Sequence, residues 1–365
     1  MNFDLSDDAK TLQGAARKFL DARAGPAVAR QVMEGDAPHD ADLWAAIIAQ
    51  GWPAARVPEA HGGLGLGADE ACVLAEEIGR SLAPVPLLSS MQVIEALLLA
   101  GTPAQQAEWL PKLASGEAIG ALAWGEGDAK SLTGTPAMTL QNGTITGSKS
   151  PVADGMLATV AVVTIATPDG PAMALVSLAG VQVEPQETLD LVRKSARLTF
   201  DNTPAEPLGT ASDWLKLTER LAVLAAFEAL GTAEASRDMT VAYAKDRVAF
   251  GQRIGRYQGV KHKLADMYIK AELARAHALH GCWAWEADAP ELAQAASAAR
   301  VASLDALKLA AEESLQLHGG IGFTWEHDCQ FYYRRNRQLS AALGSRAHWA
   351  DRLVRALEQR NRAAA

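Results

Sequence analysis

The hydrophobic pattern of the sequence changes its period twice along the chain. Over residues 7–119, alanines and leucines recur at helical spacing, and this spacing returns after residue 209 and continues to the end. Over residues 122–209 the pattern is that of strands, with the hairpin dipeptide Asn142-Gly143 between two alternating runs. A second turn, Pro168-Asp169-Gly170, separates two further apolar runs. We therefore predict a mainly α protein with a central antiparallel β domain, divided into residues 1–120, 121–209 and 210–365.

The chain is long and apolar enough to fold around a large core. It has 365 residues, of which 49% are hydrophobic, so we do not expect disorder. No apolar run reaches the roughly 20 residues that cross a bilayer, and Met1 to Lys10 are polar and acidic, unlike a signal peptide. We expect a cytoplasmic protein that does not insert into a membrane.

Cysteine usage and charge exclude several classes of protein. Cys72, Cys282 and Cys329 are odd in number and form no CxxC pair, which argues against a disulfide framework or a zinc site. The net charge of -9 disfavours a nucleic-acid partner, because phosphate binding needs a basic face. Residues 331–365 are the exception, since they carry eight arginines against Asp351 and Glu358. This tail is either a solvated helical face or a contact for an acidic partner or a phosphate.

Two segments late in the chain carry residue types that suit a phosphate-bearing cofactor. Arg247 to Gln258 reads RVAFGQRIGRYQ, and Gln316 to Thr324 reads QLHGGIGFT. A guanidinium pairs with phosphate, a glutamine amide both donates and accepts hydrogen bonds, and glycines allow close approach to the backbone. The run Gly63 to Gly67 has neither the preceding strand nor the spacing of a Rossmann fingerprint, and the chain has no Walker, nucleophile-elbow or HExxH motif.

Both segments resemble signatures of the acyl-CoA dehydrogenase family, and Pro58 with Gly62-Gly63-Leu64-Gly65 resembles its N-terminal motif. The resemblance implies an N-terminal helical domain, a middle β domain and a C-terminal four-helix bundle. It also implies FAD as cofactor, an acyl-CoA substrate and an electron-transfer flavoprotein as electron acceptor. In the family, positions matching Arg247, Phe250 and Gln258 contact the FAD of a neighbouring subunit, so at least a dimer is expected. Positions matching three further residues lie near the adenosine half: Gln316, Gly319 and Gly320.

The middle of the chain departs from the family pattern where the flavin ring is expected. Ala123 to Gly127 stands in place of the usual Thr-Glu-Pro motif. Gly147 to Gly155 resembles the strand and loop beside the isoalloxazine, but the usual tryptophan-threonine pair is absent. Val152 and Ala153 are the matching positions there, and Ser345 is a further expected cofactor contact.

The catalytic base is the part of the family pattern that the sequence lacks. An ungapped count places the usual glutamate on Leu343, before Gly344 and Ser345, and the alternative family position on Leu221. Neither leucine can take a proton. Glu219 lies two residues from the second position, but two residues turn a helical side chain by about 200°. Three other acidic residues remain conceivable bases that nothing in their spacing selects: Glu228, Glu326 and Asp328.

The hypothesis that follows is a subunit of an acyl-CoA dehydrogenase that contributes FAD contacts and an interface but no base. It would work as a homodimer or as a heterotetramer with a homologous subunit, as in heteromeric bacterial enzymes that act on bulky acyl groups, including steroid side chains. Three alternatives stay open. They are an active homomeric dehydrogenase using Glu219, a structural homologue without flavin, and an oxidase that passes electrons to oxygen.

Overall fold

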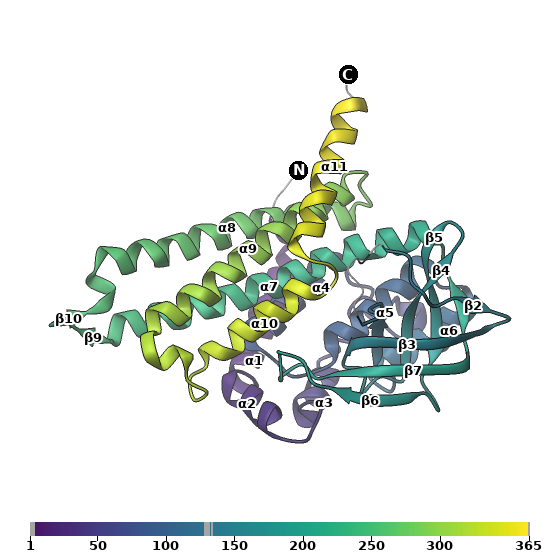
Figure 1. Ribbon diagram of the computed structural model, residues 1–365, viewed down its shortest axis with the longest axis horizontal. Coiled ribbons are helices and arrows are strands. Elements are labelled where there is room, and N and C mark those ends of the chain that lie inside the picture. The colour runs from purple at the N-terminus through teal and green to yellow at the C-terminus, as the bar shows by residue number, and fades with distance from the viewer. Residues whose placement is uncertain (1–3, 128–131, 133, 364–365) are drawn as a thin grey trace. The chain divides into compact units, whose positions relative to one another are not determined.

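The computed structural model describes residues 4–127, 132 and 134–363, and its elements follow the predicted order of helices, strands and helices (Figure 1). The predicted fold class is therefore confirmed. By contacts, the chain forms two compact units. A helical unit comprises residues 1–29, 68–83 and 222–365, and a mixed unit comprises residues 30–67 and 84–221. The division into three domains at residues 120 and 209 stays a prediction.

The mixed unit contains two four-stranded sheets. One has the order β1-β4-β5-β8, in which β1 is parallel to β4 and the other pairs are antiparallel. The other has the order β2-β3-β7-β6 and is antiparallel throughout. The parallel pair departs from the antiparallel pattern expected for this region. The strands are β1 (Gly120–Ala123), β2 (Leu140–Gln141), β3 (Thr144–Ala153), β4 (Val160–Thr167), β5 (Gly170–Ser177), β6 (Gln182–Gln186), β7 (Ser195–Pro204) and β8 (Glu206–Leu208).

Local turn chemistry explains both predicted hairpins. Asn142 and Gly143 have φ of 50° and 79°, and they join β2 to β3 with Gln141 opposite Thr144. Left-handed values at both turn residues define a type I′ hairpin turn, and Asn-Gly adopts them at least cost. The second turn joins β4 to β5, with Thr167 opposite Gly170. A shared apolar core, which includes Val152, Leu198 and Phe200, packs between strands of both sheets.

The remaining elements of the mixed unit are short helices with identifiable starts. Asp40 accepts a hydrogen bond from Leu43 N at 2.8 Å, which caps α3. Thr102 and Gln105 form a capping box at the start of α6, with Pro103 at the first helical position. The helices that lie wholly in this unit are α3 (Ala41–Ala49), η1 (Glu59–His61), α5 (Leu87–Ala100) and α6 (Pro103–Ala114), while α2 (Pro26–Glu34) begins in the helical unit.

Long helices build the helical unit. Helix α8 packs along a seam of residues spaced by fours and threes, in which Met267, Ala271, Ala274 and Ala278 are all buried. Among the described residues, no helix combines the length and the apolar character needed to span a bilayer. The elements are α1 (Asp7–Arg23), α4 (Ala68–Ser81), α7 (Ala211–Asp246, shared with the mixed unit), β9 (Val248–Ala249), β10 (Gln252–Arg253), η2 (Ile254–Arg256), α8 (Gln258–Glu286), α9 (Leu292–His318), η3 (Gly319–Phe323), α10 (Cys329–Ala341) and α11 (Arg346–Ala363).

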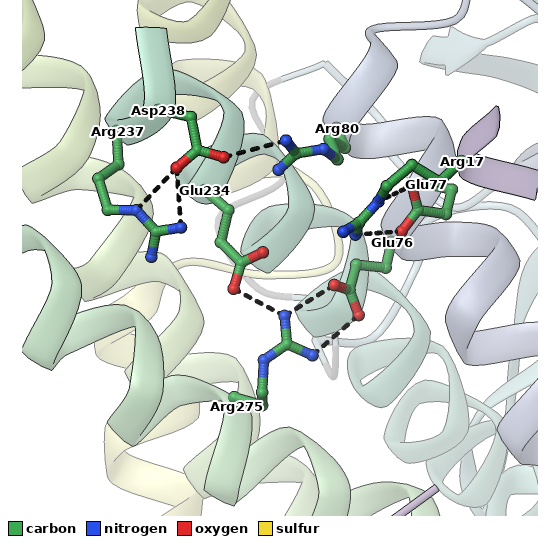
Figure 2. Close-up of polar contacts among 8 residues, drawn as sticks. All are labelled: Arg17, Glu76, Glu77, Arg80, Glu234, Arg237, Asp238 and Arg275. Atoms are coloured by element: carbon green, nitrogen blue, oxygen red, sulfur yellow. Dashed lines mark hydrogen bonds and ion pairs between the residues drawn. The ribbon is translucent and has the colours of Figure 1, made fainter. Parts of the chain in front are cut away.

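A buried ion network ties four of these helices together (Figure 2). Arg275 of α8 lies 2.7 Å from carboxylate oxygens of both Glu76 on α4 and Glu234 on α7. Arg17 of α1 lies 2.6 Å from Glu77, which is 1% exposed. Burial raises the pKa of Glu76, and Arg275 opposes that shift. Glu76, Glu77 and Glu234 each have a guanidinium partner, which offsets part of the desolvation penalty of these carboxylates.

Candidate functional site

The arginine signature forms a tight hairpin at one end of α7 and α8 (Figure 1). Phe250 is 97% exposed and has φ of 53°, and Gly251 follows with φ of 82°. The Tyr257 hydroxyl donates to the carbonyl oxygens of Ala249 at 3.0 Å and Phe250 at 3.2 Å. Because these bonds hold the turn from inside, the phenylalanine side chain is presented to the outside on a braced backbone.

The three predicted FAD contacts in this segment are all exposed in the single chain. Arg247 follows the last residue of α7, and Gln258 is the first residue of α8. The Arg247 carbonyl accepts a hydrogen bond from Ile254 N at 2.8 Å, which closes the hairpin. Val248, which is 58% exposed, adds a second apolar side chain to the surface of this hairpin. The contacts to FAD themselves stay a prediction.

The glycine turn lies at the end of α9, where the helix stops at His318. Gly319 has φ of 66°, and a Cβ atom added at Gly319 or Gly320 would meet nothing within 4 Å. Gln316 and both glycines are exposed. The backbone here is therefore open to close approach by another molecule. The contact with the adenosine half of a cofactor, which the family resemblance implies, stays a prediction.

Tyr243 connects the hairpin to the glycine turn. It lies four residues before Arg247, and its hydroxyl donates to the His318 carbonyl at 3.3 Å. The Tyr243 and His318 rings also pack with centroids 4.2 Å apart. The structure thus joins the two signature segments, about sixty residues apart in sequence, through a residue that the sequence analysis had not singled out.

The strand expected beside the flavin ring is the long strand β3. Val152 is fully buried and pairs with Ala196, while Ala153 is half-buried and pairs with Ser195. The Val152 side chain lies in the core of the mixed unit, so only its backbone remains available for a ligand contact. Both residues stay predictions as cofactor contacts.

The altered segment Ala123 to Gly127 has an internal electrostatic role. Lys149 of β3 is fully buried, and its Nζ lies 2.6 Å from Glu126 and 2.9 Å from Thr164 Oγ1. Glu126 also accepts hydrogen bonds from the backbone amides of Ala137 at 2.7 Å and Met138 at 3.2 Å. Burial lowers the pKa of Lys149, and Glu126 opposes that shift. Glu126 is therefore engaged in structure, although residues 128–131 lie outside the described part of the chain.

The loop at the usual base position keeps a defined backbone around an apolar side chain. Leu343 follows the end of α10, is 3% exposed and has φ of 55°. Its carbonyl accepts a hydrogen bond from Trp349 Nε1 at 2.7 Å. Arg300, which is fully buried, donates to the carbonyls of Leu339 and Ala342 beside it. Burial lowers the pKa of Arg300 to about 10, so it stays charged at neutral pH.

Ser345 begins the next helix instead of ending the loop. Its hydroxyl oxygen accepts a hydrogen bond from His348 N at 3.2 Å, directly before α11 starts at Arg346. An N-terminal cap of this kind stabilises a helix whatever else the residue does. Ser345 is exposed, and its role as a cofactor contact stays a prediction.

The other acidic candidates are not equivalent in the structure. Leu221 is 1% exposed within α7, and Glu219 is half-buried two residues before it. Glu228 is 3% exposed and lies 3.2 Å from Arg335, an almost fully buried partner. The Glu228 carboxylate is therefore engaged in a buried ion pair within the helical unit. Glu326 is exposed, and Asp328 directly precedes α10.

Comparison with known proteins supports the resemblance over most of the chain. Residues 6–117 match the family domain described as acyl-CoA dehydrogenase, N-terminal domain, and residues 217–357 match the corresponding C-terminal domain. The sequence is 35% identical over 330 residues to acyl-CoA dehydrogenase IpdE2 of Mycobacterium tuberculosis, covering 90% of this chain and 91% of that protein.

Solved structures agree with that similarity. A variant of the Tcur3481-Tcur3483 steroid ACAD superposes with a TM-score of 0.91 at 30% identity, covering 98% of this chain and 99% of that one. The ChsE4-ChsE5 complex from Mycobacterium tuberculosis contains a chain that superposes with a TM-score of 0.90 at 26% identity, with the same coverage. The second of these structures is a complex of two named proteins, ChsE4 and ChsE5.

Proposed function

The chain belongs to the acyl-CoA dehydrogenase family of oxidoreductases, and from that premise we propose that it is a subunit that supplies FAD contacts but no catalytic base. The observation that carries the proposal is Leu343, an apolar and buried side chain on an otherwise intact base loop. The reaction is the α,β-dehydrogenation of an acyl-CoA thioester, completed with a homologous subunit that contributes the missing carboxylate.

The described residues fit the cofactor that this family uses. FAD, when bound, supplies the acceptor for the hydride that leaves the β-carbon. Arg247 is exposed and positively charged beside the braced hairpin, which suits a pyrophosphate. Gly319 and Gly320 leave their backbone open, which suits close approach of an adenosine moiety. All of these residues face outward in the single chain, so they would serve an FAD shared with a neighbouring subunit.

The chain's own residues cannot perform the proton transfer at either family position. Removal of the α-proton needs a carboxylate within hydrogen-bond reach of the substrate. Leu343 and Leu221 have no titratable atom, and Glu228 is bound to Arg335. The partner subunit would therefore hold the base, while this chain binds and orients the cofactor and forms part of the interface.

A bulky acyl group and a flavoprotein electron acceptor complete the proposal. The similarity to a steroid ACAD at 30% identity over 98% of this chain supports a ring-bearing acyl-CoA as the substrate class. Electrons would leave through an electron-transfer flavoprotein, as the family resemblance implies.

The test is an absorbance spectrum of the purified chain before and after anaerobic addition of acyl-CoAs, first alone and then with its homologous partner. We expect flavin absorption to persist with the chain alone and to bleach only when the partner is present. Bleaching by the chain alone, abolished by Glu219→Gln, would instead establish a homomeric enzyme. Protein that cannot be reconstituted with FAD, alone or with the partner, would indicate a structural homologue without flavin. Release of hydrogen peroxide would indicate an oxidase.

A further inference from the structure

Three side chains with metal-binding atoms meet beneath the glycine turn of the helical unit. His318 ends α9, His327 lies in the turn before α10, and Cys329 is the first residue of α10. One donor atom from each lies within 4.8 Å of the others. His318 and Cys329 are buried and His327 is half-buried. Such a group of two imidazoles and one thiol needs a physical explanation.

The protonation of His318 follows from its hydrogen bond. Its Nδ1 lies 2.8 Å from the Ser314 carbonyl oxygen, which can only accept a hydrogen bond. Nδ1 therefore carries the proton, and Nε2 is left with a lone pair. Among the described residues, buried Nε2 has no hydrogen-bond partner. A buried acceptor without a partner destabilises the fold, so this atom is poised for a group that accepts its lone pair.

The Cys329 sulfur lies beside the Nδ1 atom of the His318 ring, and the His327 ring packs against that ring. The Cys329 sulfur lies 3.3 Å from His318 Nδ1 and 3.4 Å from Ser314 Oγ. The His327 ring centroid lies 4.5 Å from that of His318. His327 Nδ1 accepts a hydrogen bond from Cys329 N at 3.2 Å, a long bond that a metal at the same lone pair would replace. Nitrogen and sulfur donors of this kind prefer zinc over magnesium or calcium.

We propose that His318, His327 and Cys329 bind one zinc ion, with a solvent molecule or an added ligand at the fourth position. Binding replaces the thiol proton of Cys329 by a zinc–sulfur bond and releases that proton to solvent. The Ser314 carbonyl orients His318, the usual arrangement around zinc-bound histidines. Zinc–nitrogen bonds of about 2.0–2.1 Å and a zinc–sulfur bond of about 2.3 Å place tetrahedral nitrogen donors about 3.3 Å apart and a nitrogen and the sulfur about 3.6 Å apart. Donors that now lie within 4.8 Å of one another must therefore close by up to about 1.5 Å.

The position of the site gives it a structural consequence. The chain between His318 and Cys329 contains the turn η3, whose exposed glycines are the predicted adenosine contacts. An ion bound at both ends would close this segment into a loop and reduce its freedom. Zinc would therefore hold the turn in the shape that presents Gly319 and Gly320. The site itself does not depend on the proposed dehydrogenase function.

The test is a zinc titration of the full chain after chelator treatment, with a competing chromophoric chelator and no acyl-CoA. We expect one zinc ion per chain, and we expect Cys329→Ser and His318→Gln each to weaken its binding at least about tenfold. His277→Gln, on the exposed face of α8, and Cys282→Ser, a buried cysteine elsewhere in the unit, are the matched controls and should bind as the parent chain does.

Two further measurements keep the proposal falsifiable if a variant is unstable. The unfolding midpoint of each metal-free variant shows whether its fold survives. X-ray absorption at the zinc edge of the unmodified protein should show one sulfur and two nitrogen neighbours. No saturable binding, a spectrum without sulfur, or unchanged affinity in folded Cys329→Ser would overturn the site.

Discussion

Leu343 lies in a loop that is held by hydrogen bonds to its backbone carbonyl groups. Trp349 Nε1 donates to the Leu343 carbonyl oxygen, and Arg300 donates to the carbonyl oxygens of Leu339 and Ala342 nearby. Leu343 also has a left-handed φ of 55°, a conformation that few non-glycine residues adopt. At the scale of single residues, the side chain at position 343 therefore decides whether this position can accept a proton. The hydrogen bonds that hold the loop involve backbone carbonyls and do not depend on that side chain.

Leu343→Glu should restore a base to the chain. We expect anaerobic bleaching of its flavin by acyl-CoA without the partner, where the parent chain shows none, because the carboxylate returns to the family position. The unfolding free energy should fall by about 1–3 kcal/mol, since the site is 3% exposed. Leu343→Gln is the matched control, because glutamine has nearly the same shape as glutamate but no carboxylate to accept the proton. If it bleached equally, a carboxylate at this position would not be the missing group.

The buried pair of Glu228 and Arg335 gives a prediction about stability. Arg335→Met removes the guanidinium 3.2 Å from a carboxylate that is 3% exposed, which should lower the unfolding free energy by about 3–5 kcal/mol. Urea unfolding measures the loss. The control is Arg355→Met, whose pair with Asp351 is solvent-exposed and should matter by less than about 1 kcal/mol. Equal effects of the two variants would contradict the structural role of the pair.

Helices α4 and α7 approach each other through a reciprocal pair of glycines. A Cβ atom on Gly79 would lie 2.2 Å from the Glu228 carbonyl oxygen, and one on Gly231 would lie 2.0 Å from the Glu76 carbonyl oxygen. Backbone cannot move aside as a flexible side chain can. At the scale of elements, this crossing fixes the spacing of the two helices whose carboxylates receive Arg275.

Gly231→Ala should therefore destabilise the fold despite the higher helix propensity of alanine. We expect a loss of at least about 1–3 kcal/mol in unfolding free energy from the overpacked crossing. Gly14→Ala in α1 is the matched control, because a Cβ there meets nothing within 4 Å. That control should be neutral or stabilise by up to about 1 kcal/mol. A neutral Gly231→Ala would show that the two helices separate easily.

The hairpin of β9 and β10 gives the opposite expectation, a functional loss without a loss of stability. Phe250→Ala removes a side chain that is 97% exposed, so the unfolding free energy should change by less than about 0.5 kcal/mol. We expect the purified variant to retain much less FAD per chain. Val354→Ala, an exposed apolar residue of α11, should retain FAD normally. Full FAD content in Phe250→Ala would remove this residue from the cofactor site.

At the scale of the whole molecule, the sequence predicted what depends on local pattern and missed what depends on distant contacts. The change of period and the Asn142-Gly143 turn were sufficient for the element order. The parallel pairing of β1 with β4 could not be predicted, because their separation of about forty residues allows either direction. The pairs Lys149–Glu126 and Glu228–Arg335 leave no spacing signal for the same reason. Nor does the sequence show that both compact units are discontinuous.

Cofactor retention should depend on assembly of the whole protein. The predicted FAD contacts of the hairpin are exposed in the single chain and would serve a neighbouring subunit. On dilution, we expect subunit dissociation and FAD release to follow the same concentration dependence, measured by sedimentation and flavin fluorescence. A monomer that keeps its FAD would contradict the sharing of the cofactor between subunits.

The backbone-held loop at Leu343 has a consequence for how such proteins diversify. Because Trp349 and Arg300 bind its backbone, the shape of the loop does not require one particular side chain at its centre. A gene duplicate can then lose or regain the acid by a change in one codon without first losing its fold. Division of labour between two near-identical chains is thus a short evolutionary step, and one that remains reversible.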